Sequence, residues 1–208
     1  MRYLFLLFAV LIAAPARAQN APFDYYVLSL GWSPSWCSQT GDARGDPQCD
    51  RGRGFGFLLH GLWPQYEQGW PDNCQSAKRP PSRAATAAMA DIMGSSGLAW
   101  HEWKKHGTCS GLSADDYFAT ARQAYRQTRI PAYFTRLTRD VTVPPRVIED
   151  AFIEANPQLT RDKITVTCDG GRIAEVRICL TPSLEPRPCA PDTAQDCRNP
   201  GALLEPVR

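Results

Sequence analysis

Hydrophobic residues in this chain gather into short runs, and the residue types in each run predict either a strand or a helix. Four runs are rich in aromatic and β-branched residues, which favour strands. They cover residues 23–32, 55–59, 164–168 and 172–180. Asp169, Gly170 and Gly171 separate the last two runs and favour a tight hairpin turn, so these two runs are expected to pair.

Four other segments contain mainly helix-forming residues. They cover residues 82–93, 100–107, 113–129 and 145–155. Gly94 ends the first helix, and Gly107 permits the second, shorter one to end. Ser113 opens the third helix in a sequence that resembles a capping box, with aspartate in place of the usual glutamate. Pro145 begins the fourth helix, and Asn156, which precedes another proline, stops it.

The predicted strands and helices alternate irregularly, without the regular βαβ repeat of a parallel sheet. This order favours an α+β fold, in which several helices pack around a central antiparallel sheet. Residues 33–54, residues 64–82 and the proline-rich tail from Thr181 are predicted to be irregular. The sequence has no internal repeat and no linker, so residues 19–208 are expected to form a single domain.

The first residues predict export. Arg2 precedes an apolar run over residues 4–14, and residues 16–18 (Ala-Arg-Ala) match a small-x-small cleavage site. We therefore expect residues 1–18 to be a signal peptide and the protein to be periplasmic or extracellular. The alternative is a membrane anchor, which the shortness of the apolar run disfavours. No membrane association is expected after cleavage.

The charge balance limits how the protein can bind a polyanion. The chain has 23 Lys and Arg residues against 21 Asp and Glu. Arg2 and Arg17 lie in the leader, which has no acidic residue, so the exported part has a formal charge of about zero. A polyanion would therefore be bound at a local cationic site and not by the field of the whole molecule.

All eight cysteines lie in the exported part of the chain. They are Cys37, Cys49, Cys74, Cys109, Cys168, Cys179, Cys189 and Cys197. An even number in an exported protein predicts four disulfides, although the spacing alone leaves about a hundred possible pairings. Zinc binding is the alternative, and the lack of paired CxxC motifs disfavours it. The sequence has no Asn-x-Ser/Thr glycosylation site, which favours a bacterial source.

Every histidine lies in one of two short motifs. His60 is in FLLHGLWPQ (residues 57–65), and His101 and His106 are in WHEWKKHGTCS (residues 100–110). Histidine has the unperturbed pKa closest to neutral pH, so this placement indicates acid–base chemistry.

In a helix, successive residues turn by about 100°. With His101 at zero, Lys105 lies near 40°, Glu102 near 100° and His106 near 140°, by the same roughly 100° step. The spacing therefore predicts one face with two imidazoles, one carboxylate and one ammonium group.

Two other interpretations of the second motif must be considered. A zinc protease would have HExxH, but here the histidines are five residues apart and their rings diverge by about 140°. Lys105 would also place a positive charge beside the metal, so a metal site is disfavoured. The second alternative is a solvated helix whose histidines have no role. Trp100 and Trp103 argue against simple exposure of this segment.

His60 alone is weak evidence, because a histidine after an apolar strand is often a core residue. Its neighbours strengthen the case. Gly61 permits close approach of another element, and Trp63 offers a flat surface on which a base could stack. Plain core packing is an equally good interpretation of Trp63 by itself.

Two imidazoles, a carboxylate and a lysine without a metal suit phosphodiester transfer in RNA. One imidazole takes the proton of the 2′-hydroxyl, which attacks phosphorus, and the other protonates the departing 5′-oxygen. A cation beside the phosphorane stabilises its extra negative charge. The products are 2′,3′-cyclic phosphates and then 3′-phosphates, and DNA is excluded because it lacks the 2′-hydroxyl.

The two histidine motifs, in this order, resemble the active-site segments of the ribonuclease T2 family of secreted or vacuolar endoribonucleases. The first predicted strand with Trp32, Pro34 and Cys37 is similar to the family's first strand, and EVRICL around Cys179 is similar to its late hairpin. The resemblance covers most of the exported chain. It implies metal-independent cleavage of single-stranded RNA, with RNA as the partner and no cofactor, by a bacterial-type member that is a monomer.

The resemblance also implies a role for each site residue. His106 would be the general base on the 2′-hydroxyl, and His60 the general acid on the 5′-oxygen. His101 would help to hold the phosphate. Glu102 and Lys105 would polarise it and stabilise the pentacoordinate state.

Base recognition is where the sequence departs from the family. Trp63 would stack on a base. Many members have Gln where this chain has Gly31, and often an acid or asparagine where it has Gln65. We therefore expect low base specificity.

The family's disulfide pattern would select one pairing of the cysteines. The implied bonds are Cys37–Cys49, Cys74–Cys109, Cys168–Cys197 and Cys179–Cys189.

A different class of function also stays open at this point. The chain could be a non-catalytic secreted RNA-binding or toxin-like protein on the same fold, although the complete set of histidine, glutamate and lysine argues against it.

Overall fold

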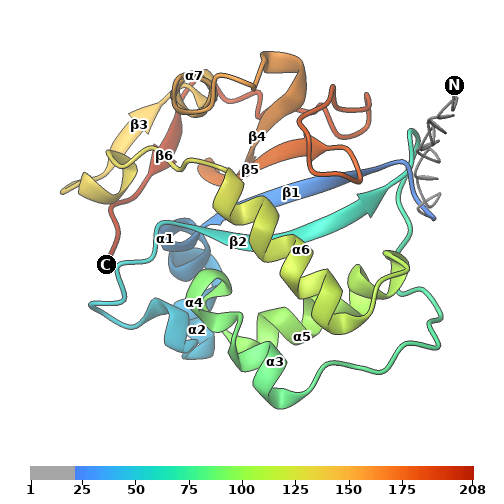
Figure 1. The fold of residues 1–208 in the computed structure, drawn as a ribbon. Helices are drawn as coiled ribbons and strands as arrows, with labels where there is room; N and C mark the ends of the chain where they lie inside the picture. The colour runs from blue at the N-terminus through green and yellow to red at the C-terminus, as the bar shows by residue number, and fades with distance from the viewer. Residues whose placement is uncertain (1–21) are drawn as a thin grey trace, which may run out of the picture.

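A central sheet organises the protein (Figure 1). The computed structural model describes residues 22–208, so the predicted signal peptide lies outside the described residues. The described strands are β1 (Tyr25–Trp32), β2 (Phe57–Gln65), β3 (Val141–Val143), β4 (Ile164–Asp169), β5 (Arg172–Leu180) and β6 (Ala202–Leu204). Their order is β2-β1-β5-β6-β3, and β4 also pairs with β5. All pairings are antiparallel except that of β5 with β6.

Helices lie around this sheet, and several of them pack directly against it. They are α1 (Ser33–Trp36), α2 (Asp42–Arg44), α3 (Arg83–Ala87), α4 (Ala90–Met93), α5 (Ser96–Lys105), α6 (Ala114–Gln127) and α7 (Pro145–Ala155). Figure 1 shows α3 to α6 gathered beside β2, and α7 beside β4. Apolar side chains of α6, such as Phe118, join Leu28, Leu59 and Leu62 of the strands in one buried cluster. The predicted α+β class is confirmed.

The predicted third and fourth helices are confirmed. The Ser113 hydroxyl caps α6: it accepts the Asp116 backbone N–H at 3.2 Å and donates to the Asp116 carboxylate at 2.6 Å. Helix α7 covers the predicted residues 145–155. The first prediction is only partly right, because residues 82–93 form two short helices, α3 and α4, with Ala88 and Met89 between them.

The prediction of an irregular segment over residues 33–54 is wrong. It contains α1, a π-helical turn (Cys37–Gly41), α2 and a 3-10 turn (Pro47–Cys49). Gly41 explains why it is compact: a Cβ there would lie 2.4 Å from the Cys49 Sγ and 2.5 Å from the Trp36 ring. Close packing around the disulfide therefore favours helical turns where the residue types alone indicated a loop.

The four disulfides join the pairs that the family resemblance implied. They are Cys37–Cys49, Cys74–Cys109, Cys168–Cys197 and Cys179–Cys189. Cys74–Cys109 fastens the turn after α5 to the loop that follows β2. Within residues 22–208, each helix is too short or too polar to cross a membrane.

Candidate active site

His60 lies at a break in the register of the sheet. Strand β2 is longer than the predicted 55–59 segment and runs through the whole first motif, because it pairs with β1 along its length. Ser29 pairs with Gly61 and Leu30 pairs with Leu59, which leaves His60 without a partner in β1. Such a bulge bends the strand and re-aims the side chain of the extra residue. The imidazole is 38% exposed, so it is accessible to a ligand.

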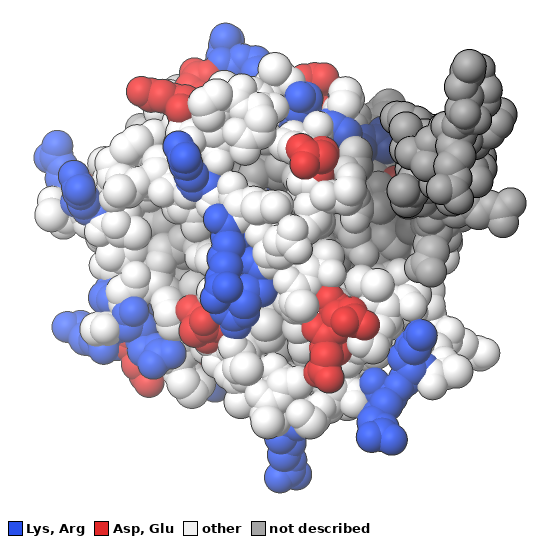
Figure 2. Space-filling view, in the orientation of Figure 1, with Lys and Arg blue, Asp and Glu red and all other residues white. Residues whose placement is uncertain are grey.

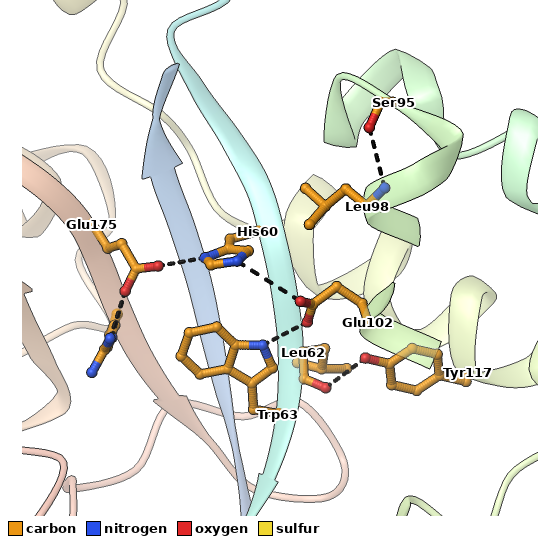
Figure 3. A network of polar contacts seen from close by, with 9 residues as sticks. His60, Leu62, Trp63, Ser95, Leu98, Glu102, Tyr117 and Glu175 are labelled. Carbon is orange, nitrogen blue, oxygen red and sulfur yellow. Dashed lines mark hydrogen bonds and ion pairs between the residues drawn. The ribbon is translucent and has the colours of Figure 1, made fainter. Parts of the chain in front are cut away.

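Glu102 of α5 reaches this strand from the other side of the site (Figure 3). Its side chain is only 2% exposed. The Trp63 indole N–H donates to Glu102 Oε2 at 2.7 Å, and Glu102 Oε1 lies 3.8 Å from His60 Nε2. Gly61 permits this approach, because a Cβ there would lie 2.0 Å from Glu102 Oε2. Burial is the main cause that raises the pKa of Glu102 to about 7, against the opposing effects of His60 and Trp63.

His106 follows the last residue of α5 and is buried against Trp63. The two rings are stacked, with centroids 5.2 Å apart and planes inclined by 27°. Its Nδ1 is buried and has no hydrogen-bond partner in the described structure. Burial, and then the charges of Lys105, His60 and His101, lower the pKa of His106 to about 3. The ring is therefore neutral near neutral pH.

The pKa of His60 is shifted in the opposite direction. Burial alone would lower the pKa of His60, but the hydrogen bond and charge of Glu175 and the charge of Glu102 outweigh it and raise that pKa. Glu175 lies on β5, and its Oε1 contacts His60 Nδ1 directly. Burial also opposes ionisation of Glu175, yet His60 and Arg177 hold the pKa of this carboxyl at about 2. The two site histidines are thus shifted in opposite directions.

His101 and Lys105 lie towards the outside of this cluster. His101 is exposed, while Lys105 is half-buried. Partial burial, followed by the charges of Lys105 and Lys104, lowers the pKa of His101. The Lys105 carbonyl accepts the Asn73 backbone N–H at 2.8 Å, which ties the end of α5 to the loop after β2. The predicted single face is therefore only partly right, because His106 lies beyond the helix, and Glu102 and His106 turn inward whereas His101 faces solvent.

The tryptophans of the two motifs also differ in their exposure to solvent. Trp103 is buried and Trp100 is 39% exposed, so only the first supports the expectation of a covered segment. Trp63 is half-buried, and the Arg177 guanidinium lies 5.2 Å from its ring centroid. Base stacking by Trp63 stays a prediction, and the structure adds a hydrogen bond from its indole to Glu102.

Glu175 and Arg177 were missed by the sequence analysis. Arg177 Nε and Nη2 donate to Glu175 Oε2 at 2.8 and 2.6 Å. The usable signal was two opposite charges, two residues apart, in the middle of a mainly apolar strand, because such residues share one face of the sheet.

A cavity of about 780 Å³ opens beside these residues. His60, His101, Glu175 and Arg177 help to line it, as does Trp36 of α1. Within residues 22–208, no group of three or more His, Cys, Asp and Glu side chains is arranged to hold a metal ion. The arrangement offers one neutral imidazole, one imidazole whose protonated form is favoured by two carboxyl groups, and the buried Glu102 carboxyl group near His60 and Trp63.

Comparisons with known proteins agree with the two motifs. A sequence model of the Ribonuclease T2 family matches residues 23–189. The ribonuclease of Aeromonas hydrophila is 40% identical over 119 residues, which is 57% of this chain and 53% of that protein. The probable ribonuclease of Haemophilus influenzae is 33% identical over 133 residues, 58% of this chain and 48% of that protein. The chain thus spans about half the length of these curated relatives.

Solved structures share the fold. RNase NT, whose crystal structure is a complex with 5′-AMP, superimposes with a TM-score of 0.65 at 23% identity. The alignment covers 89% of this chain and 99% of that one. At this level of identity, the likeness supports the arrangement of strands and helices and nothing finer.

Proposed function

The chain belongs to the ribonuclease T2 family, and we propose that it is an endoribonuclease that cleaves single-stranded RNA without a metal ion. The observation that carries this proposal is the pair of histidines with opposed pKa shifts. The pKa of His106 is lowered to about 3 and that of His60 is raised. His106 is therefore held in its neutral form and can accept a proton, while the carboxylates beside His60 favour its protonated form, so the site offers one candidate base and one candidate acid.

In the proposed reaction, neutral His106 takes the proton of the 2′-hydroxyl. The 2′-oxygen attacks phosphorus, and the bond to the 5′-oxygen breaks as His60 transfers its proton to that oxygen. The product is a 2′,3′-cyclic phosphate. When water later attacks the cyclic phosphate, the proton transfers run in reverse and leave a 3′-phosphate.

The remaining site residues act on the phosphate. Lys105 and His101 supply positive charge or hydrogen bonds to its oxygens, where charge develops in the transition state. Glu102 is protonated below about pH 7, in line with its raised pKa, and can then donate a hydrogen bond to a phosphate oxygen. A neutral carboxyl also avoids repulsion between Glu102 and the phosphate.

Substrate recognition in this proposal is local. Figure 2 shows acidic and basic side chains interspersed on the face that it presents, without one dominant basic patch. This supports the expectation that RNA is bound at the site and not by a general field. Trp63 would stack on a base, and Gly31 and Gln65 would give low base specificity.

We also propose that the protein is exported and acts as a monomer, with residues 1–18 as the signal peptide and residues 19–208 as the domain. The four disulfides support an oxidising compartment, either a periplasm or the outside of the cell. Amino-terminal sequencing of the exported protein and its elution volume on size exclusion would test both statements.

The test of function is digestion of a fluorogenic single-stranded RNA by residues 19–208 in EDTA, with end mapping of the products. We expect cyclic-phosphate ends, and no cleavage when the attacked nucleotide is 2′-deoxy. His60→Ala and His106→Ala should each remove most activity, whereas Glu149→Gln, on α7 and outside the site, should retain it. Loss of wild-type activity in EDTA would refute the proposal. Tight RNA binding without cleavage would instead favour the non-catalytic alternative.

A further inference from the structure

We propose that Glu175 is a positioning residue that acts through His60: it holds the imidazole so that Nε2 faces the leaving oxygen. This inference rests on the proposed function, because it assigns a partner to the acid of that reaction. Glu175 lies 115 residues beyond His60 in the sequence and belongs to neither histidine motif.

Both oxygens of Glu175 are occupied by donors. Oε1 contacts His60 Nδ1, and Oε2 accepts two hydrogen bonds from Arg177 at 2.8 and 2.6 Å. An acceptor-only carboxylate requires that Nδ1 carries a hydrogen. His60 can therefore give up a proton only from Nε2 and then remains as the Nδ1–H tautomer. Glu175 takes no proton in this step, and Arg177 holds its carboxylate in place.

In this orientation, His60 Nε2 points toward the part of the site where the substrate would bind. His60 Nε2 faces Glu102, whose Oε1 is 3.8 Å away (Figure 3). That gap lies between β2 and α5, beside the cavity that His60 and His101 help to line. A phosphate bound by residues of α5 would thus meet the nitrogen that carries the mobile proton.

Two backbone features allow Glu175 to reach His60 across β1. Gly31 of β1 pairs with Glu175, so it lies between β2 and β5 on the face that carries both side chains. Gly31 has no side chain to fill this space, and even a Cβ would come within 3.8 Å of the His60 Cβ. The bulge at residue 60 turns the imidazole over the same space. Gly31 thus has a role here that is separate from base recognition.

Electrostatics support the assignment. The charged groups that act on His60 are Glu175, Glu102 and Arg177, and it is also coupled to His101 and His106. Glu175 is the main influence that opposes burial and raises the pKa of His60. Without this carboxylate, His60 would lose its proton at lower pH and would be free to rotate.

The alternative is that Glu175 and Arg177 only brace β5, so the experiment must separate positioning from stability. We would compare Glu175→Gln, Glu175→Asp and, as a matched control, Glu149→Gln. Glu149 is also a buried carboxylate with an arginine partner, since Arg161 lies 3.2 Å from it, but it is on α7. Two substrates are needed: RNA, and a nucleoside 3′-(4-nitrophenyl) phosphate, whose good leaving group needs no acid.

We expect Glu175→Gln to lower kcat/KM on RNA at least about tenfold, and at most by the roughly 10²–10⁴-fold that general acid catalysis contributes. Activity on the nitrophenyl ester should be nearly unchanged, which also shows that the variant is folded. The basic limb of the pH profile should move to lower pH, and Glu175→Asp should restore part of the loss. In a His60→Ala background, Glu175→Gln should cause no further loss.

A measurement without catalysis separates this inference from the proposed function. The chain has three histidines, so the His60 resonance can be assigned from single His→Ala variants and titrated by NMR. Its pKa should fall in Glu175→Gln and stay unchanged in Glu149→Gln. An unchanged titration, or equal losses on both substrates, would overturn the positioning role while the ribonuclease proposal stands. Failure of the wild type to cleave RNA would overturn the proposed function, and with it the positioning role that rests on it.

Discussion

Gly61→Ala adds a single methyl group, and we expect it to damage the site more than alanine would at any other glycine described here. The added Cβ would lie 2.0 Å from Glu102 Oε2 and 2.3 Å from Trp63 Nε1. Ordinary contacts begin near 3.4 Å, so the Glu102 carboxylate must retreat by more than an ångström. It cannot retreat and keep its 2.7 Å hydrogen bond to the Trp63 indole.

Two costs follow from this displacement. Loss of this buried hydrogen bond costs about 0.5–1.5 kcal/mol, and overpacking adds about 1–3 kcal/mol. We therefore expect the free energy of unfolding to fall by about 1.5–4.5 kcal/mol. For a domain of this size, Tm should drop by about 3–18 °C, at about 2–4 °C per kcal/mol. A displacement of about 1 Å at a catalytic group can also lower activity about 10²-fold.

The assay combines thermal unfolding with kcat/KM on a fluorogenic RNA at 25 °C. Gly97→Ala is the matched control, because a Cβ at this exposed position of α5 meets only Ser95 Oγ, at 3.8 Å. In that variant we expect an unchanged or slightly higher Tm, since alanine favours a helix by about 0.5–1 kcal/mol. If Gly61→Ala kept both the wild-type Tm and the wild-type kcat/KM, the argument from close packing would be refuted.

Three further predictions concern pH and stability. In the proposed reaction His106 acts as a neutral base and His60 as a protonated acid. We therefore expect kcat/KM to be lost as pH falls through the lowered pKa of His106, about 3, and as pH rises through the raised pKa of His60. A profile still rising above about pH 9 would contradict these roles. Burial and Asp196 raise the pKa of Glu149 from 4.5 to about 7, so this carboxyl stabilises the fold below pH 4.5 and that contribution disappears as pH rises to 7. Thermal melts should then show Tm of the wild type declining over this range relative to Glu149→Gln, and parallel curves would disprove the assignment. Cys74→Ser with Cys109→Ser opens a loop with a separation of 35 residues and should cost about 4 kcal/mol in chemical unfolding, whereas a loss below about 1 kcal/mol would show that the bond does not restrain the unfolded chain.

Local sequence signals were enough to find half of the site. Adjacent residues determine the turn at residues 169–171 and the ends of α6 and α7. The sequence therefore predicted these elements well. For α5 the prediction was only partly right, because the helix begins at Ser96, before the predicted Trp100, and ends at Lys105, so that His106 lies just beyond it. Helical spacing also could not tell which of the four ionisable residues turn inward, because burial of Glu102 and His106 depends on β2 packing against the helix.

Other features depend on contacts between distant segments, which no local pattern contains. The meeting of Glu175 with His60 requires the strand order β2-β1-β5 and a glycine in the intervening strand. The length of β2 depends on its pairing with β1, which extends the strand beyond the predicted residues 55–59 and through Pro64. Proline is tolerated there because β2 forms an edge of the sheet.

The bulge at His60 also makes the protein's chemistry separable from its folding. Because no residue of β1 pairs with His60, a different side chain at this position leaves the register of the two strands intact. The other histidine of the pair, His106, lies just beyond the last residue of α5 and not inside the helix. Substitution at position 60 should therefore leave the strand pairing intact, and its cost in stability comes from the lost contact with Glu175. The protein can thus lose or alter its reactive group by mutation while keeping a folded scaffold on which new chemistry could arise.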